Sequence, residues 1–257
     1  MPRATRNTPG CVLFLLDSSG SMHGAKCDSL AKCVNETIQD FLGICTSGAE
    51  ILDRFFLGAI RYGSEVGPAI TFDGDAKILR PLSALESLQF PADGSEDRQW
   101  VQPLAAGGTP MGEAFRQACE ALAEWVQKHP ESPRPVVINV TDGQANDPAQ
   151  AAEGAKKLRE LSCNDGTTVV FNIHITDQSL APIILPDAQR LDEHNFGLEN
   201  DFARHLFEMS SELPNEMILV AERLFPVAPP KLGSKAFAFN APLKWLPKLF
   251  QVGTLPG

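Results

Sequence analysis

Three short stretches of the chain carry hydroxyl and carboxylate side chains at spacings that suit a hard divalent cation. The first, at residues 17–21, follows the pattern D-x-S-x-S, with an oxygen-bearing side chain at every second position. The second has a threonine after two glycines, and the third is an Asp-Gly pair. Hydroxyl and carboxylate oxygens are the donors that Mg²⁺ takes in proteins. Asp17, Ser19 and Ser21 are therefore donors of the type that a magnesium-like cation takes, and Thr109 and Asp142 add further oxygen donors at two other strand-to-helix transitions.

Each stretch also has a plainer explanation when it is taken alone. Ser21, or Thr109 in front of Pro110, can cap the helix that follows. An Asp-Gly pair is most often a turn. The glycines at 107 and 108 are not followed by the Lys-Ser/Thr pair of a phosphate-binding loop. The five residues together, in this order, favour the metal site over these separate structural roles.

The elements that must position these residues alternate between strand and helix patterns. Strands are expected at 11–16, 55–62, 69–72, 135–141, 167–175 and 183–185, and helices at 25–44, 81–88, 111–126, 149–161, 202–213 and 216–224. This alternation predicts a Rossmann-like α/β fold, with a mainly parallel central sheet, one antiparallel edge strand and helices on both faces. Loops after parallel strands meet at the carboxyl edge of such a sheet, so Asp17 and Asp142 can come together there.

The chain divides into three parts by composition. Residues 1–9 form a polar lead-in, residues 10–224 carry the strand and helix pattern, and residues 225–257 form a basic, proline-rich C-terminal arm. The arm has four lysines and no acidic residue, and its aromatic residues include Phe237, Phe239, Trp245 and Phe250. Packing of the arm on its own chain and docking to another protein both remain open at this point.

The net charge and the cysteines indicate which kinds of partner the protein can have and in which compartment it lies. A net charge of −10 argues against nucleic acid as the main partner. The six cysteines form no C-x-x-C pair, and several fall at apolar positions, which favours buried thiols in a reducing compartment. No apolar run approaches the about 18–20 residues that cross a bilayer. We therefore expect no membrane partner and a cytoplasmic location.

The motifs at residues 17–21, 107–109 and 142–143 together resemble the metal-ion-dependent adhesion site (MIDAS) of von Willebrand factor type A (VWA) domains. The resemblance covers roughly residues 9–213 and is nearest to short stand-alone bacterial VWA proteins. It implies that the Ser19, Ser21 and Thr109 hydroxyls bind Mg²⁺ directly, with Mn²⁺ or Ca²⁺ as alternative metals. Asp17 and Asp142 would then act mostly through coordinated waters.

The resemblance implies a protein-binding module and not an enzyme. Neutral hydroxyl ligands leave the charge of the cation available to an Asp or Glu carboxylate of a partner protein. Some proteins of this type occur beside a protein kinase and a metal-dependent serine/threonine phosphatase, which makes these the candidate partners in a signalling or stress-response system. The alternatives are a scaffold that docks through the C-terminal arm and a Mg²⁺-dependent phosphohydrolase that uses Asp17. The second alternative lacks an acid/base carboxylate two residues on, where Ser19 stands.

Overall fold

The structure is a computed structural model, and it describes residues 3–71, 77–88, 98–177, 179–197 and 200–255. Its strands are β1 (Gly10–Asp17), β2 (Thr46–Ser47), β3 (Glu50–Ile51), β4 (Phe55–Tyr62), β5 (Val66–Pro68), β6 (Arg80–Pro81), β7 (Val136–Thr141), β8 (Ser162–Cys163), β9 (Gly166–Thr167), β10 (Val169–His174), β11 (Ile183–Ile184) and β12 (Phe237–Phe239). Its α-helices are α1 (Ala25–Cys45), α2 (Leu82–Glu86), α3 (Met111–Lys128), α4 (Pro148–Glu160), α5 (Ala188–Asp192), α6 (Asn200–Met209), α7 (Asn215–Leu224) and α8 (Leu246–Thr254). Short 3₁₀ turns lie at Gly20–Met22 (η1) and Leu243–Trp245 (η3).

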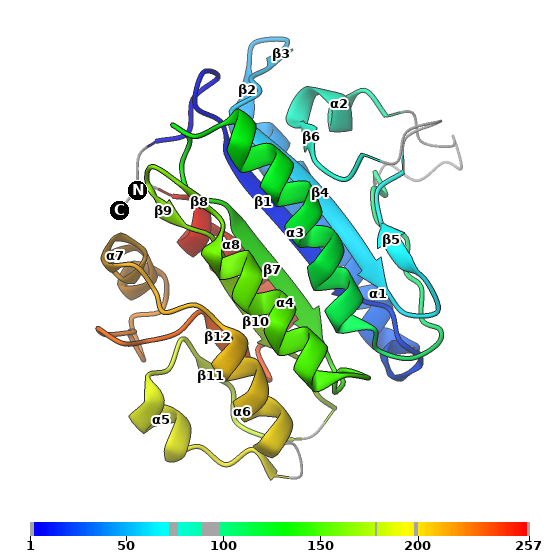
Figure 1. Ribbon diagram of the computed structural model, residues 1–257, viewed down its shortest axis with the longest axis vertical. Helices are drawn as coiled ribbons and strands as arrows, with labels where there is room; N and C mark the ends of the chain where they lie inside the picture. The colour runs from blue at the N-terminus through cyan, green and yellow to red at the C-terminus, as the bar shows by residue number, and fades with distance from the viewer. Residues whose placement is uncertain (1–2, 72–76, 89–97, 178, 198–199, 256–257) are drawn as a thin grey trace.

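One large sheet forms the centre of the molecule, in the order β11-β12-β10-β7-β1-β4-β5 (Figure 1). The five strands from β12 to β4 are parallel, which confirms the expected α/β fold. On one edge, β5 and β6 pair antiparallel with β4, which confirms the expected antiparallel edge of the sheet. The other edge carries a second antiparallel strand, β11, which the sequence analysis did not predict as an edge.

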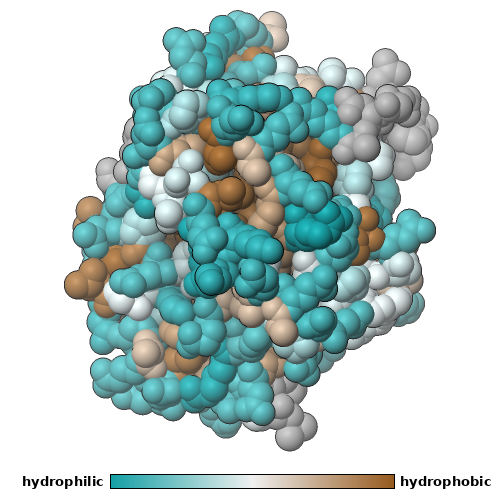
Figure 2. All heavy atoms as spheres, viewed as in Figure 1, coloured by the Kyte–Doolittle hydropathy of each residue, from teal (hydrophilic) through white to brown (hydrophobic). Residues whose placement is uncertain are grey.

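β1 supplies core residues to both faces of the sheet. Side chains alternate across a strand, so Val12, Phe14 and Leu16 pack on one face and Leu13 and Leu15 on the other. The first face is covered by α1, α7 and α8, and the second by α3, α4 and α6 (Figure 1). Hydrophilic residues cover most of the outer surface over α3 and α4 (Figure 2). Burial on both faces is what a continuous apolar strand predicts.

The expected strand at residues 69–72 is wrong in its position. The strand that pairs with β4 is β5, so the ladder starts three residues earlier and includes Gly67 and Pro68. Glycine and proline are typical of turns, yet a proline is tolerated in an edge strand because its missing N–H faces away from the ladder. Ala69 adds one further hydrogen bond, from its N–H to Ala59 O at 2.7 Å. Residue 72 lies outside the described residues.

The C-terminal segment contributes to the sheet and to its helical cover. β12 lies between β10 and β11, and its three residues are buried. α8 packs on the face that holds α1, where the ring of Phe250 lies 4.7 Å from Phe41 and 6.0 Å from Phe14. The segment therefore packs against its own chain, while the domain boundary after residue 224 stays a prediction.

Two expectations from composition concern thiols and membranes. The six cysteines are free thiols, and Cys11, Cys33, Cys45 and Cys163 are buried. Burial raises the pKa of Cys33 to about 12 and that of Cys163 to about 11, which keeps both thiols protonated. Among the helices that the structure describes, none combines the length and the apolar character that a membrane crossing needs.

Candidate functional site

Backbone hydrogen bonds hold the loop before α3 against the loop after β1. The Ala106 N–H donates to Ser18 O at 2.7 Å, and the Gly20 N–H donates to Gly107 O at 2.9 Å. The two loops therefore cross at the carboxyl edge of the sheet. This crossing brings Thr109 to the side of the sheet where the D-x-S-x-S motif lies.

The crossing requires glycine at two positions. Gly107 has a φ of +81°, and a Cβ atom there would lie 2.5 Å from the backbone nitrogen of Ser64. A Cβ atom on Gly63 would lie 2.5 Å from Ser18 O and 2.7 Å from Ala106 O. Only residues without a side chain let the three loops approach so closely.

Asp17 is the last residue of β1, and its side chain is held from two directions. One carboxylate oxygen, Oδ1, accepts the Ser19 N–H at 2.8 Å, and the other, Oδ2, accepts the Thr141 hydroxyl at 2.6 Å. The residue is only 2% exposed. Burial raises the pKa of Asp17 to about 6, although the hydrogen bonds from Thr141 and Ser19 work in the opposite direction. The carboxylate is thus oriented before any ligand arrives.

The remaining four predicted residues meet next to Asp17. Ser19 Oγ and Ser21 Oγ are 3.0 Å apart, and the Ser21 hydroxyl donates to Asp142 Oδ1 at 2.7 Å. Thr109 lies beside them, since a Cβ atom added to Gly143 would be 3.4 Å from Thr109 Oγ1 and 3.5 Å from Ser21 Oγ. The structure therefore brings the five oxygen-bearing side chains of three distant segments to one place.

The capping roles offered as the plainer explanation are wrong. The residue before α3 is Pro110 and not Thr109, and no side chain caps that helix. The residue before α1 is Gly24, again without a side-chain cap. Ser19 precedes η1 but makes no capping hydrogen bond. The Ser19 and Ser21 hydroxyls therefore contact each other, and Ser21 contacts the Asp142 carboxylate, instead of capping a helix.

Besides Thr141, two further residues contact the site, and the sequence analysis predicted none of the three. Asn146 makes two hydrogen bonds to the backbone of Thr109. Its side-chain Oδ1 accepts the Thr109 N–H at 2.9 Å, and its backbone N–H donates to Thr109 O at 3.0 Å. Lys26 Nζ contacts Asp142 Oδ2 and lies 2.9 Å from Asp177 Oδ2. The signal for Lys26 was a cation in the first turn of a helix, a position that the helix dipole disfavours.

Neither of the two histidines nearest these residues is one of the five oxygen donors. His23 is exposed, and His174 is fully buried, with its ring stacked on Phe239 at 4.8 Å. Burial lowers the pKa of His174 to about 3, so the ring is neutral. Asp73, Asp75 and the acidic run at 93–97 fall outside the described residues.

The donor set consists of oxygen atoms, which suit a hard divalent cation. In the part of the chain that the structure describes, no group of three or more His, Cys, Asp or Glu side chains is placed to hold a metal ion. A cation at the edge of the sheet would instead take the hydroxyl oxygens of Ser19, Ser21 and Thr109, with the two carboxylates close by. Neutral oxygen donors with flanking carboxylates suit Mg²⁺, Mn²⁺ or Ca²⁺ better than zinc or copper.

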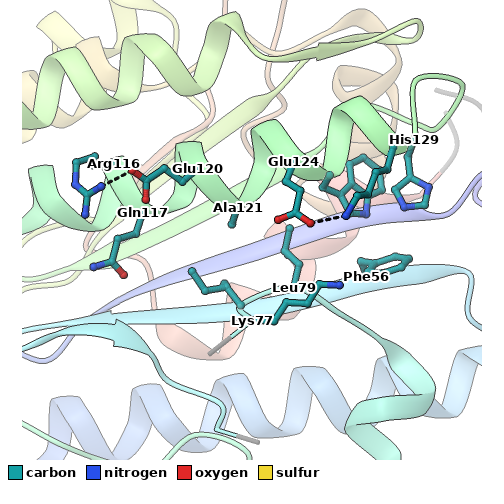
Figure 3. A pocket seen from close by; sticks show the side chains of 12 residues that line it. Phe56, Lys77, Leu79, Arg116, Gln117, Glu120, Ala121, Glu124 and His129 are labelled. Atoms are coloured by element: carbon teal, nitrogen blue, oxygen red, sulfur yellow. Dashed lines mark hydrogen bonds and ion pairs between the residues drawn. The ribbon is translucent and has the colours of Figure 1, made fainter. Parts of the chain in front are cut away.

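A cavity of about 590 Å³ lies elsewhere, between α3 and the β4 edge (Figure 3). Its lining includes Phe56, Trp125 and His129, and salt bridges join Arg116 to Glu120 and Lys128 to Glu124 across successive turns of α3. None of the five oxygen donors lines it. The cavity is therefore separate from the candidate site.

Comparison with known families identifies the class of protein. The sequence model of the von Willebrand factor type A domain matches residues 12–212. The chain therefore belongs to the von Willebrand factor type A domain family. Domains of this family are typically modules that bind other proteins and not enzymes. No curated protein matches the sequence.

Several solved structures are similar at low sequence identity. Proximal thread matrix protein 1 of the mussel byssus is 14% identical with a TM-score of 0.47, over 80% of this chain and 42% of that one. The manganese-loaded TRAP protein of Plasmodium vivax is 17% identical with a TM-score of 0.40, over 82% and 67%. The pilus adhesin SpaC of Lactobacillus rhamnosus GG is 12% identical with a TM-score of 0.46, over 81% and 28%. This chain spans less than half of the mussel and Lactobacillus chains.

Proposed function

We propose that the protein binds a partner protein through a Mg²⁺ ion held at the carboxyl edge of the sheet. Ser19, Ser21 and Thr109 would supply hydroxyl ligands, and Asp17 and Asp142 would hold the ion mostly through water. The observation that supports this is the meeting of the three segments, in which Ser21 Oγ lies 2.7 Å from Asp142 Oδ1 and Thr109 Oγ1 lies alongside.

The chemistry of the donors explains why such a site would bind an acidic partner. Hydroxyl ligands carry no charge, so they leave most of the charge of the cation uncompensated. An Asp or Glu side chain of the partner can then enter the open coordination position and form a charge-assisted contact. The two aspartates are needed because hydroxyls alone hold a divalent ion weakly.

We also propose which metal and which kind of partner protein the site binds. Mg²⁺ is the first choice, and Mn²⁺ and Ca²⁺ are the alternatives that the same oxygen donors accept. A protein kinase or a metal-dependent serine/threonine phosphatase, in a cytoplasmic signalling or stress-response system, is the candidate partner. This choice rests on the resemblance to short stand-alone bacterial VWA proteins.

The two alternative functions have less support. A phosphohydrolase would need Asp17 as an accessible nucleophile, yet the residue is 2% exposed and both of its oxygens accept hydrogen bonds. A scaffold that docks through the C-terminal arm would need exposed aromatic residues. Phe237, Phe239 and Phe250 are instead buried in the core of the chain itself.

Calorimetric titration with Mg²⁺ and Mn²⁺ tests the proposal. We expect the parent to bind one ion, and Thr109→Ala and Asp142→Asn to weaken binding about 10- to 100-fold while keeping a cooperative unfolding transition. Ser47→Ala, in the β2–β3 hairpin at the opposite end of the sheet (Figure 1), and Asp40→Asn are the controls, because both residues are exposed.

A capture experiment tests whether the protein binds its proposed partner through the metal. The immobilised parent should retain the kinase or phosphatase in Mg²⁺ buffer and release it when a chelator is added. If Thr109→Ala and Asp142→Asn capture these proteins as well as the parent does, the site is not the interface. Retention after chelation would instead favour a metal-independent docking surface.

A further inference from the structure

We infer that Lys26 is an internal counter-cation that competes with the divalent ion for Asp142 and so lowers the metal affinity of the site. The inference rests on the proposed metal site and adds a residue that sets its affinity. It is carried by a salt bridge that joins the first turn of α1 to the loop after β7.

The contacts of Asp142 show that this carboxylate is shared. Its Oδ1 accepts the hydroxyl of Ser21, while its Oδ2 pairs with Lys26 Nζ. The Asp142 side chain is only 1% exposed, and the Lys26 side chain is 21% exposed. The ammonium group and the Ser21 hydroxyl therefore contact different oxygens of the same carboxylate.

The charge of Lys26 has opposite effects with and without a divalent ion. In the metal-free protein the ammonium group compensates a buried carboxylate that would otherwise be costly. When a divalent ion binds beside the same carboxylate, the ammonium group repels it. A positive unit charge that shares a carboxylate with a doubly charged ion lowers the affinity for that ion about tenfold, even when the dielectric constant is close to that of water.

Asp177 is a second carboxylate partner for Lys26. It follows β10, its side chain is 78% exposed, and its Oδ2 lies 2.9 Å from Lys26 Nζ. Lys26 can therefore give up Asp142 when a metal arrives and keep one carboxylate partner. Removal of Asp177 should leave Lys26 with Asp142 alone, and thus should strengthen the competition.

Metal titration of lysine variants tests the inference. We expect Lys26→Met to bind Mn²⁺ about tenfold more tightly than the parent, as measured by calorimetry and by the loss of the free Mn²⁺ resonance signal. In chelator its melting temperature should fall, and the rise on adding Mg²⁺ should exceed that of the parent. Lys26→Arg keeps the charge and should behave as the parent does. Lys32→Met, on the same helix with a 75% exposed side chain, is the matched control.

A second variant keeps the test decisive if Lys26→Met folds poorly. Asp177→Asn changes an exposed side chain and should weaken Mn²⁺ binding. Part of that loss would come from the lost charge itself, so the substitution is repeated in the Lys26→Gln background. If Asp177 acts through Lys26, the loss should be smaller there.

The outcomes separate the two proposals. If the parent binds Mn²⁺ and neither Lys26→Met nor Lys26→Gln binds it more tightly, the role of Lys26 is wrong while the metal site stands. If neither the parent nor the Lys26 variants bind Mn²⁺, the proposed metal site is wrong, and the inference fails with it.

Discussion

The Thr141 hydroxyl donates a hydrogen bond to Asp17 Oδ2 at 2.6 Å, and so joins the last residue of β7 to the last residue of β1. The same hydroxyl oxygen accepts the Gly143 N–H at 3.2 Å. Thr141 is fully buried, although it is not among the predicted metal ligands. The Thr141 side chain thus orients the Asp17 carboxylate at the end of β1 and also holds the start of the loop that follows β7.

Removal of that hydroxyl should loosen Asp17. Thr141→Val keeps the shape of the side chain and suits a strand, but it leaves Asp17 Oδ2 without its donor. We expect the free energy of unfolding in chelator to fall by about 1–3 kcal/mol, and Mn²⁺ affinity to fall about tenfold. Urea unfolding and calorimetry measure the two effects. The control is Thr46→Val, at the exposed start of β2, where the hydroxyl donates only to Leu42 O, away from the site. Unchanged Mn²⁺ affinity in Thr141→Val would show that Asp17 does not need this contact.

Asn146 should matter because it holds Thr109. Asn146→Ala removes the acceptor of the Thr109 N–H, so we expect Mn²⁺ binding to weaken about tenfold. Because Asn146 is exposed, water can replace part of the lost hydrogen bond, and stability should fall by only about 1 kcal/mol. Asn164→Ala, another exposed asparagine, serves as the control and should leave the metal titration as in the parent. A normal titration curve for Asn146→Ala would rule out this positioning role.

The loop crossing should depend on Gly107. Gly107→Ala adds a Cβ atom that would meet the Ser64 backbone at 2.5 Å, at a φ of +81°. We expect a loss of more than about 1–2 kcal/mol in the free energy of unfolding, and weaker metal binding because Thr109 shifts. Gly67→Ala is the matched control, since a Cβ atom there meets nothing within 4 Å. Equal stability of the two variants in urea would contradict a crossing that requires glycine.

His174 should make the fold sensitive to acid. Burial lowers its pKa to about 3, whereas an unfolded histidine has a pKa of about 6.5. Between these values the unfolded chain binds a proton that the folded chain does not, so the stability falls as the pH falls below about 6.5. The loss should reach about 2 kcal/mol at pH 5 relative to pH 7.

The test compares urea unfolding in chelator at pH 7 and pH 5. The difference between the two pH values should be smaller in His174→Asn by about 2 kcal/mol, whatever the absolute stability of that variant. Asp17 titrates in the same range and contributes to the pH dependence of both proteins. The contribution of His174 is therefore the difference between the parent and His174→Asn. His23→Asn, at an exposed position, should keep the full difference. An identical difference in His174→Asn and the parent would mean that His174 does not carry the effect.

The parts of the fold with strong local patterns could be predicted from the sequence. β1 is a continuous apolar run, and the apolar residues of α1 and α3 keep helical spacing over many turns, so their positions were predicted within one or two residues. The helix expected at residues 149–161 is α4, and its N-cap Asp147 accepts the Gln150 N–H. Such elements depend on residues close together in the sequence.

The missed elements depend on distant partners. β12 has only three residues in a proline-rich segment, and it is a strand because β10 and β11 lie on either side of it. Thr141 and Asn146 contact the site through partners 124 and 37 residues away, which no local pattern records. The five oxygen donors were predictable as a set because the motif around each stretch is itself local. Their binding of a metal stays a prediction.

The place of β12 also bears on how the chain matures during synthesis. Among the described strands, β11 pairs only with β12, and β10 has β12 as its neighbour on that side. Translation delivers β10 and β11 before β12, so the nascent polypeptide carries an open sheet edge until the residues of β12 leave the ribosome. Such an edge is a template for aggregation, and it is where a chaperone would protect the growing chain.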